Sequence, residues 1–146
     1  MFCMGLERLV YESTATGSTN SLGNLAVILA ESHRNNARDG LSGALAAHAD
    51  RYIQAIEGPR AALDALLRRL EDDPRHRDLR LLDRFTTDHR MFEGWTMANA
   101  RVTPALERLL DTMMARDVPS PSWILMALRE AVATAPDIEC RRRQAG

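Results

Sequence analysis

The chain has 146 residues, of which 45% are hydrophobic, and a formal net charge of −1. This length and composition fit one ordinary domain with a real hydrophobic core, and the interleaving of arginines with acidic residues argues against the basic stripe of a nucleic-acid-binding surface. The chain contains no lysine, which excludes Schiff-base chemistry and phosphate binding by a P-loop lysine.

The first predicted elements are a strand, a loop and a helix. Leu6–Ser13 alternates loosely, which is typical of a strand, and Thr14–Asn20 is rich in Thr, Ser and Gly, which is typical of a loop. Ser21 is a candidate cap for a helix from Leu22 to about Asn36. The apolar stripe of this helix follows the i, i+3, i+4, i+7 spacing and consists of Leu25, Ile28, Leu29 and Ser32.

A hairpin, a second helix and a fourth strand follow the helix-ending sequence Arg38-Asp39-Gly40. The hairpin strands are Leu41–His48 and Arg51–Glu57, with Ala49-Asp50 at the turn. Gly58-Pro59 breaks the second of these strands and opens a helix, because proline suits the first helical turn. That helix has one apolar face and ends at Asp73-Pro74, and the fourth strand is Leu79–Thr86.

The C-terminal third is predicted to be mostly helical. Glu93–Arg101 reads as a loop that enters a fifth, short strand. Thr103-Pro104 caps a third helix, prolines interrupt it, and Ser122–Ala135 forms a fourth, amphipathic helix. The predicted boundary near Arg101 separates a sheet-containing domain, 1–101, from a helical extension with a basic tail, 102–146.

The order of elements predicts the fold class. Strand, helix, strand, strand, helix, strand, strand is the pattern of an α+β, ferredoxin-like βαββαββ sheet with two helices on one face. The two C-terminal helices are amphipathic, so we expect them to cover the exposed face of the sheet. They are also candidates for a dimer surface.

Three residues with polar groups lie where the pattern predicts a core. Asn36 continues the apolar stripe of the first helix, where a buried amide would need partners, although Asn is also common at a helix C-cap. Gln54 shares a strand face with Tyr52 and Ile56, where its amide can exchange donor and acceptor roles by flipping; the alternatives are that it faces solvent or bonds a neighbouring strand. Tyr11 lies in the first strand, where most tyrosines simply pack.

Other chemistry-bearing residues receive plain interpretations. Trp95 and Met97 are predicted to share one face of the fifth strand and to pack there. The aspartates of the loops and helix ends are interpreted as solvated ion pairs with arginines, and they are Asp72, Asp73, Asp78, Asp83 and Asp88. The histidines and cysteines have no metal or redox spacing. No apolar run approaches the roughly 20 residues of a membrane span and no signal peptide is evident, so we expect a cytoplasmic protein without membrane or nucleic-acid partners.

Five motifs in fixed order resemble the BLUF family, the sensors of blue light using FAD, from about Gly5 to Ala98. The motifs are Leu9-Val10-Tyr11, Asn35-Asn36-Ala37-Arg38-Asp39-Gly40-Leu41-Ser42-Gly43, Gln54-Ala55-Ile56-Glu57-Gly58-Pro59, Asp73-Pro74-Arg75-His76-Arg77 and Phe92-Glu93-Gly94-Trp95-Thr96-Met97. The resemblance implies a blue-light photoreceptor that binds FAD non-covalently and is not an enzyme. Ala46-Ala47 and Asp50 depart from the larger residues and the turn glycine usual in the family, but no photochemical position is lost.

The resemblance also implies roles for individual residues. Tyr11 would donate an electron and a proton to the excited flavin, Gln54 would bridge Tyr11 and the flavin ring, and Asn36 would hold the carbonyl edge of the ring. Further cofactor contacts would come from Ile28, Ser32, Asn35, Arg75, His76 and Met97. Rotation or tautomerisation of the Gln54 amide would strengthen a hydrogen bond to the flavin carbonyl and shift absorption to the red, and Trp95 and Met97 would relay the signal.

The expected output is a change in the C-terminal helices that a separate signalling protein reads, and the chain is expected to form a homodimer or larger homo-oligomer. Two other functions are compatible with the residues. One is a small ferredoxin-like hydrolase of the acylphosphatase type that uses Arg and Asn, although the chain lacks a glycine-rich anion loop. The other is a flavin-free protein-interaction module.

Overall fold

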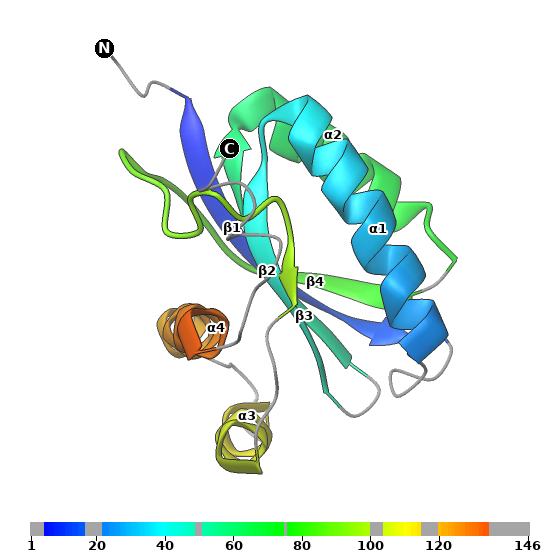
Figure 1. Ribbon diagram of the computed structural model, residues 1–146, viewed down its shortest axis with the longest axis vertical. Coiled ribbons are helices and arrows are strands. Elements are labelled where there is room, and N and C mark those ends of the chain that lie inside the picture. The colour runs from blue at the N-terminus through cyan, green and yellow to red at the C-terminus, as the bar shows by residue number, and fades with distance from the viewer. Residues whose placement is uncertain are drawn as a thin grey trace.

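The computed structural model describes residues 5–16, 22–48, 51–74, 76–99, 104–114 and 120–134. Strands and helices alternate along these ranges much as the sequence predicts (Figure 1). In chain order the elements are β1 (Leu6–Ala15), α1 (Leu22–Asp39), β2 (Ser42–His48), β3 (Arg51–Pro59), α2 (Arg60–Glu71), β4 (His76–Thr86), β5 (Ala98–Asn99), α3 (Pro104–Met114) and α4 (Pro121–Thr134).

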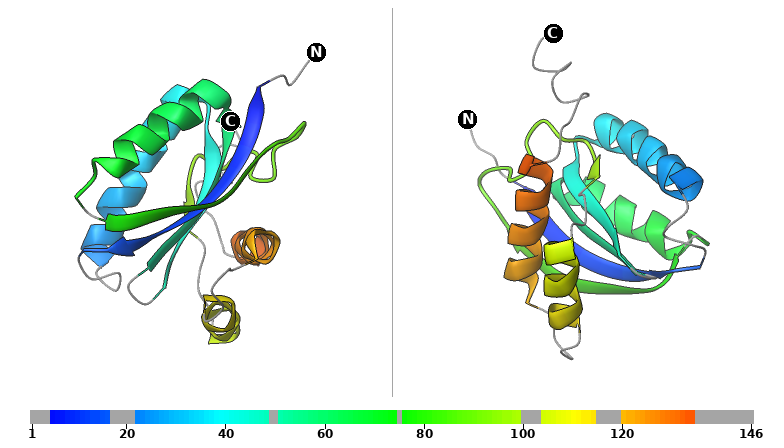
Figure 2. Two further views of the ribbon diagram at one scale, coloured as in Figure 1. Left: turned by 180° about the vertical axis from the view of Figure 1, so that it is seen from behind. Right: turned by 60° about the horizontal axis from the view of Figure 1, so that its bottom comes forward.

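The strands form one sheet in the order β4-β1-β3-β2-β5. The pairs β1–β4, β1–β3 and β2–β3 are antiparallel, and the two-residue β5 runs parallel to β2. Helices α1 and α2 lie on one face of the sheet, and α3 and α4 lie on the opposite side (Figures 1 and 2). The predicted ferredoxin-like α+β class is confirmed.

Alternation along the strands divides the core into two layers, because successive side chains of a strand point to opposite faces. Leu9, Leu45 and Ile56 belong to the layer that includes Leu63 and Leu66 of α2. The residues next to these along the strands face the second layer, which includes most of the buried residues of α4. This second layer consists of Val10, Ala44, Ala46, Ile53, Ala55, Phe92, Ala98, Leu110, Ile124, Leu125, Leu128, Ala131 and Val132. The C-terminal helix α4 therefore covers the second face of the sheet, as predicted.

Helix α1 ends three residues later than predicted, and this corrects one interpretation of Asn36. Gly40 has a φ of +72°, and the N–H of Leu41 donates to the carbonyl of Asn36 over 2.9 Å. This is the Schellman arrangement, in which glycine takes the left-handed position after the last helical residue. Asn36 is therefore not a C-cap; it lies inside the helix and the residue is 1% exposed.

Several strand boundaries also differ from the prediction, because pairing with neighbours extends strands beyond their local sequence signals. β1 continues through Ala15, which pairs with His76, so neither residue lies in a loop. β3 continues to Pro59, which is the N-cap of α2 and not part of its first turn. β5 is only Ala98–Asn99, so Trp95 and Met97 lie in the segment before it. None of the helices in the described ranges has the length and hydropathy needed to cross a membrane.

Candidate functional site

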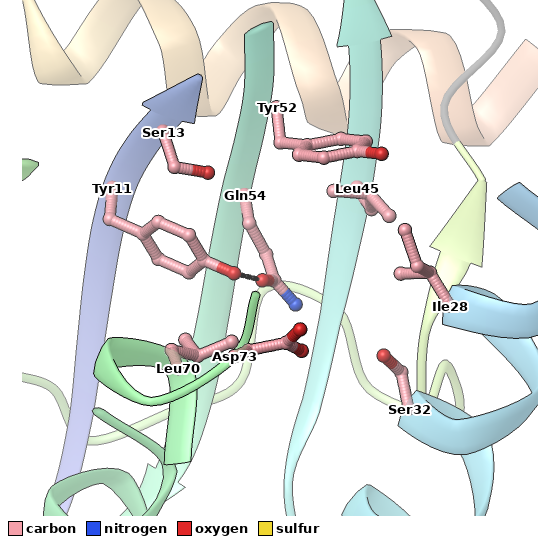
Figure 3. A pocket seen from close by; sticks show the side chains of 9 residues that line it. All are labelled: Tyr11, Ser13, Ile28, Ser32, Leu45, Tyr52, Gln54, Leu70 and Asp73. Carbon is pink, nitrogen blue, oxygen red and sulfur yellow. Dashed lines mark hydrogen bonds between the residues drawn. The ribbon is translucent and has the colours of Figure 1, made fainter. Parts of the chain in front are cut away.

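A cleft opens between α1, α2 and the sheet face that they cover. One hollow of about 60 Å³ receives side chains from β1, β2, β3, α1 and the end of α2 (Figure 3). Its lining residues are Tyr11, Ser13, Ile28, Ser32, Leu45, Tyr52, Gln54, Leu70 and Asp73. A second hollow of about 250 Å³ shares Ser32, Gln54, Leu70 and Asp73 with the first. The two therefore form one cleft near the lower end of the roughly 300–1,000 Å³ that small-molecule sites occupy.

Tyr11 and Gln54 meet at the wall of this cleft. The two residues are register partners on the antiparallel strands β1 and β3, so their side chains leave the same face of the sheet side by side. The Tyr11 hydroxyl donates a hydrogen bond to Oε1 of Gln54 (Figure 3). Nε2 of Gln54 donates to Sδ of Met97 over 3.3 Å. A buried chain of hydrogen bonds thus runs from a phenol through a carboxamide to a thioether.

The phenol of Tyr11 is held in its neutral form. Burial raises the pKa of Tyr11 well above its ordinary range, and the nearby negative charge of Asp73 raises it further. A desolvated phenolate is unfavourable in this position. Tyr11 therefore keeps its proton, with which it donates the hydrogen bond to Oε1 of Gln54.

Helix α1 holds the segment between Trp95 and Met97. Nδ2 of Asn36 donates to the carbonyl oxygen of Thr96 over 2.6 Å, and Nδ1 of His33 lies 2.6 Å from Oγ1 of the same threonine. His33 was not predicted as a site residue, although its place three residues before Asn36 puts both side chains on one helix face. The backbone between Trp95 and Met97 is therefore positioned by the same helix that lines the cleft.

Trp95 and Met97 do not share a face, contrary to the prediction. Met97 is buried in the layer of Tyr11 and Ile56, whereas Trp95 packs on the other layer, which contains Val10 and the buried residues of α4. The prediction failed because it assumed a regular strand through both residues, and the strand begins only at Ala98. The side chains of Trp95 and Met97 therefore lie on opposite sides of the sheet, while their backbone runs along the β2 edge, where the N–H of Gly43 donates to the carbonyl of Trp95 over 2.9 Å.

The remaining predicted residues fall into two groups. Ile28 and Ser32 line the smaller hollow, and Asn35 and Asn36 line the larger one. Arg75 lies outside the described residues, as does the side chain of His76, whose backbone begins β4. The predicted residues of α1 thus line the same cleft as Gln54.

Two cleft residues were missed by sequence reasoning. Asp73 was interpreted as a solvated ion pair, but its carboxylate lies in the cleft beside the Tyr11–Gln54 pair (Figure 3). Ser13 is 2% exposed, and its Oγ is buried without a hydrogen-bond partner within the described part of the chain. Buried hydroxyls are nearly always satisfied, so a ligand in this cleft would find a polar group that it can bind. The only sequence signal for Ser13 was its place two residues after Tyr11 on one strand, which puts both side chains on the same face of the sheet.

A buried ion pair supports the segment that leads to the site. Nε of Arg8 on β1 lies 2.9 Å from Oε2 of Glu57 on β3, and the side chains are 5% and 0% exposed. The Glu57 carboxylate also accepts the backbone N–H groups of Met91 (2.8 Å) and Phe92 (2.6 Å). Arg8 donates to the carbonyl of His89 over 3.0 Å. Because both charges are desolvated, this network ties residues 89–92, just before Trp95, to the middle of the sheet.

Comparison with known proteins identifies relatives of this arrangement. A family model described as BLUF, sensors of blue-light using FAD, matches residues 6–98. The chain is 31% identical over 96 residues to the photoactivated adenylate cyclase subunit beta of Euglena gracilis. That match covers 65% of this chain and 11% of the relative, so the chain spans about a tenth of the length of that protein.

Solved structures give the same picture. BlrB, a BLUF protein in its dark state, has a TM-score of 0.70 and 29% identity, and the match covers 88% of this chain and 96% of BlrB. BlsA in its photo-activated state has a TM-score of 0.75 over 90% of this chain and 97% of BlsA. The identity to BlsA is 21%, so that likeness shows the fold alone.

Proposed function

This chain belongs to the BLUF family, the sensors of blue light using FAD, and on that basis we propose that it is a blue-light photoreceptor that binds FAD non-covalently in the cleft between α1 and α2. The domain that this family describes is a photosensor and not an enzyme. The observation that carries the proposal is the buried hydrogen bond from Tyr11 to Gln54 at the wall of the cleft. An oxidisable phenol bonded to an amide that can reverse its donor and acceptor atoms is the pair that a reversible light reaction needs.

The lining of the cleft suits a flat, mostly apolar ring with a polar edge. Ile28 and Ser32 would lie beside the ring, Asn36 would bind its carbonyl edge, and Asn35 would be a further contact. The unpartnered Oγ of Ser13 offers one more polar contact. A bound flavin would supply the absorption of blue light and accept an electron. Contacts of Arg75 and His76 with the phosphates stay a prediction.

Tyr11 and Gln54 would carry the light reaction. Tyr11 would lose an electron and pass its hydroxyl proton to Oε1 of Gln54, the atom that it already bonds. Rotation of the Gln54 amide would then turn Nε2 away from Sδ of Met97, whereas tautomerisation would leave Nε2 in place with one hydrogen fewer; either change alters the Gln54–Met97 hydrogen bond. Return of the electron and the proton to Tyr11 would close the cycle, so nothing is consumed. The neutral state of Tyr11, favoured by its burial, keeps this proton in place before light arrives.

The first test is the absorption spectrum of the purified protein. We expect a yellow protein whose flavin is released as FAD on denaturation and whose absorption shifts to the red under blue light and recovers in darkness. Chromatography of the released flavin distinguishes FAD from FMN and riboflavin. A colourless protein that cannot be loaded with any flavin would contradict the proposal and favour the flavin-free interaction module.

The output would pass through residues 95–97, whose side chains reach both faces of the sheet. A redirected Gln54 amide would release Met97, and Met97 is linked through a single residue, Thr96, to Trp95 on the α4 side. A shift of this segment would change the population of α4 positions on the sheet and thereby the surface offered to a separate signalling protein. The homodimer or larger homo-oligomer also stays a prediction.

Hydrogen exchange in the lit and dark states tests this route. We expect amide exchange to increase in the light over residues 95–99 and 121–134, because these backbone groups lose packing or hydrogen bonds when the segment moves. Exchange measured by mass spectrometry on the Tyr11→Phe variant under the same light is the control and should not change. Equal exchange in both states of the unaltered protein over these residues would rule the route out.

A further inference from the structure

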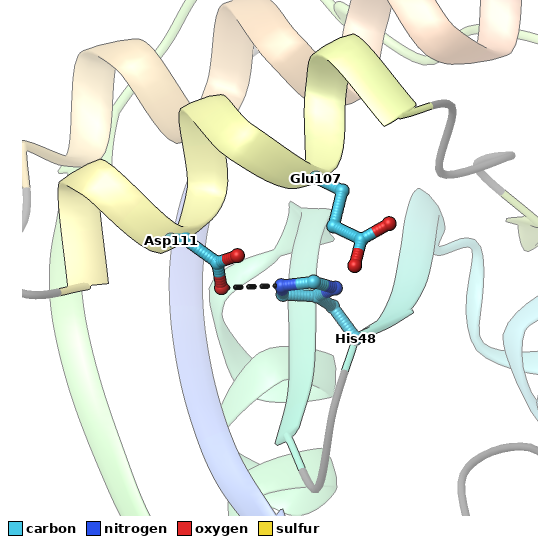
Figure 4. A group of neighbouring side chains, drawn as sticks. All are labelled: His48, Glu107 and Asp111. Atoms are coloured by element: carbon cyan, nitrogen blue, oxygen red, sulfur yellow. Dashed lines mark hydrogen bonds and ion pairs between the residues drawn. The ribbon is translucent and has the colours of Figure 1, made fainter.

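A second group of polar side chains lies where α3 meets the end of β2. His48 is the last residue of β2, and Glu107 and Asp111 lie four residues apart on α3 (Figure 4). One ligand atom from each residue lies within 4.8 Å of the other two. Nε2 of His48 is 2.7 Å from Oδ1 of Asp111. Sequence spacing predicted no metal site, because His48 is about sixty residues from the two carboxylates along the chain.

This group is separate from the flavin cleft. His48 follows Ala44 and Ala46 at intervals of two, and both alanines face the α4 layer of the core. Leu45 and Ala47, which alternate with them, face the layer of the cleft. Since side chains on one strand alternate between faces, His48 lies on the face of the sheet opposite the Tyr11–Gln54 pair.

The chemistry of the three side chains favours a cation between them. Glu107 and Asp111 are one helical turn apart on the same face of α3, where like charges repel. The imidazole of His48 is held in place, with a side chain that is 10% exposed, whereas that of Asp111 is 66% exposed. The carboxylates can therefore adjust their rotamers around a fixed nitrogen ligand without a change in the backbone.

We propose that His48, Glu107 and Asp111 bind one divalent transition-metal ion, with Zn²⁺ the best fit. Zinc accepts imidazole nitrogen and carboxylate oxygen at about 2.0–2.2 Å and is usually four-coordinate, so one position remains for water. Mg²⁺ and Ca²⁺ prefer oxygen ligands alone, which the imidazole disfavours. The bound metal would replace the His48–Asp111 contact by three bonds and fasten α3 to the edge of the sheet.

The test is zinc titration of the tag-free full chain after removal of metals by chelation, followed by isothermal titration calorimetry. We expect a site that takes one Zn²⁺ and does not take Mg²⁺, and a rise in Tm when zinc is added. His48→Ala, Glu107→Gln and Asp111→Asn should each weaken that site more than ~10-fold, since loss of even an outer-shell partner costs about 10–100-fold. Glu107 and Asp111 are exposed, so their variants should keep the fold even if His48→Ala does not.

His89→Ala is the matched control. His89 also pairs with a carboxylate, that of Asp88, over 2.7 Å, but within the described residues no third ligand joins that pair. This variant should bind zinc like the unaltered chain. Zinc bound by Cys3 or Cys140 would persist in Glu107→Gln and so remain distinguishable. Undiminished zinc binding in Glu107→Gln and Asp111→Asn, equal binding of Mg²⁺, or no binding to the unaltered chain would each overturn the proposal.

Discussion

Replacing Tyr11 by Phe, or Gln54 by Leu, is expected to abolish the light-induced red shift of the absorption spectrum while flavin remains bound. Phe removes the oxidisable hydroxyl and its proton but keeps the aromatic ring in the wall of the cleft. Leu removes the amide that accepts the Tyr11 proton and donates to Met97. In either variant the light reaction has lost one of its two partners, so the difference spectrum between lit and dark samples should be flat.

The second tyrosine of the chain provides the control for this prediction. Tyr52 lines the same hollow from β3, but the register partner of Gln54 on β1 is Tyr11. Tyr52→Phe should therefore keep the red shift, which shows that a missing phenol as such is not the cause. A normal red shift in Tyr11→Phe or in Gln54→Leu would exclude the proposed mechanism. Loss of flavin from both variants would instead assign both residues to flavin binding.

The largest effect on stability is expected from Glu57→Ala. The substitution leaves the guanidinium of Arg8, which is 4% exposed, without its buried partner. It also removes the acceptor of the Met91 and Phe92 N–H groups. Breaking a buried ion pair from one side costs about 3–5 kcal/mol, a large part of the roughly 5–15 kcal/mol that holds a domain folded. The free energy of unfolding, measured by urea denaturation, should fall by that amount.

Three further variants distinguish the contribution of the buried ion pair to stability from that of other groups. Replacing both partners by apolar residues, Arg8→Met with Glu57→Leu, should cost less than Glu57→Ala, because no charge is then left unpaired in the core. Glu57→Gln keeps the size and part of the hydrogen bonding and should be intermediate. Asp88→Ala removes an exposed partner of His89 and should leave the urea midpoint unchanged. If Glu57→Ala unfolds at the same urea concentration as the unaltered chain, the network does not stabilise the fold.

Much of the secondary structure and part of the site follow from the sequence by itself. Periods of two and of three to four predicted four strands and both N-terminal helices, since these patterns reflect geometry within a few residues. The same alternation placed Gln54 on the face of Tyr52 and Ile56, and the motifs pointed to Tyr11, Asn36 and Gln54 as partners. The order of elements was enough for the ferredoxin-like class.

Other features were decided only by the tertiary structure. Trp95 and Met97 lie on opposite sides of the sheet because the segment before β5 is irregular, and periodicity carries no information there. The side chain of Asp73 lies in the cleft because the chain turns toward the cleft after the end of α2.

Contacts between distant parts of the chain were also decided by the tertiary structure. Arg8 meets Glu57 across 49 residues, and His48 meets Asp111 across 63. Local propensities act over a few residues, whereas such contacts depend on strand register and on which helix covers which face. The sequence by itself therefore determined the elements and pointed to Tyr11 and Gln54 as a pair, and the packing of the sheet decided what surrounds that pair and what holds it.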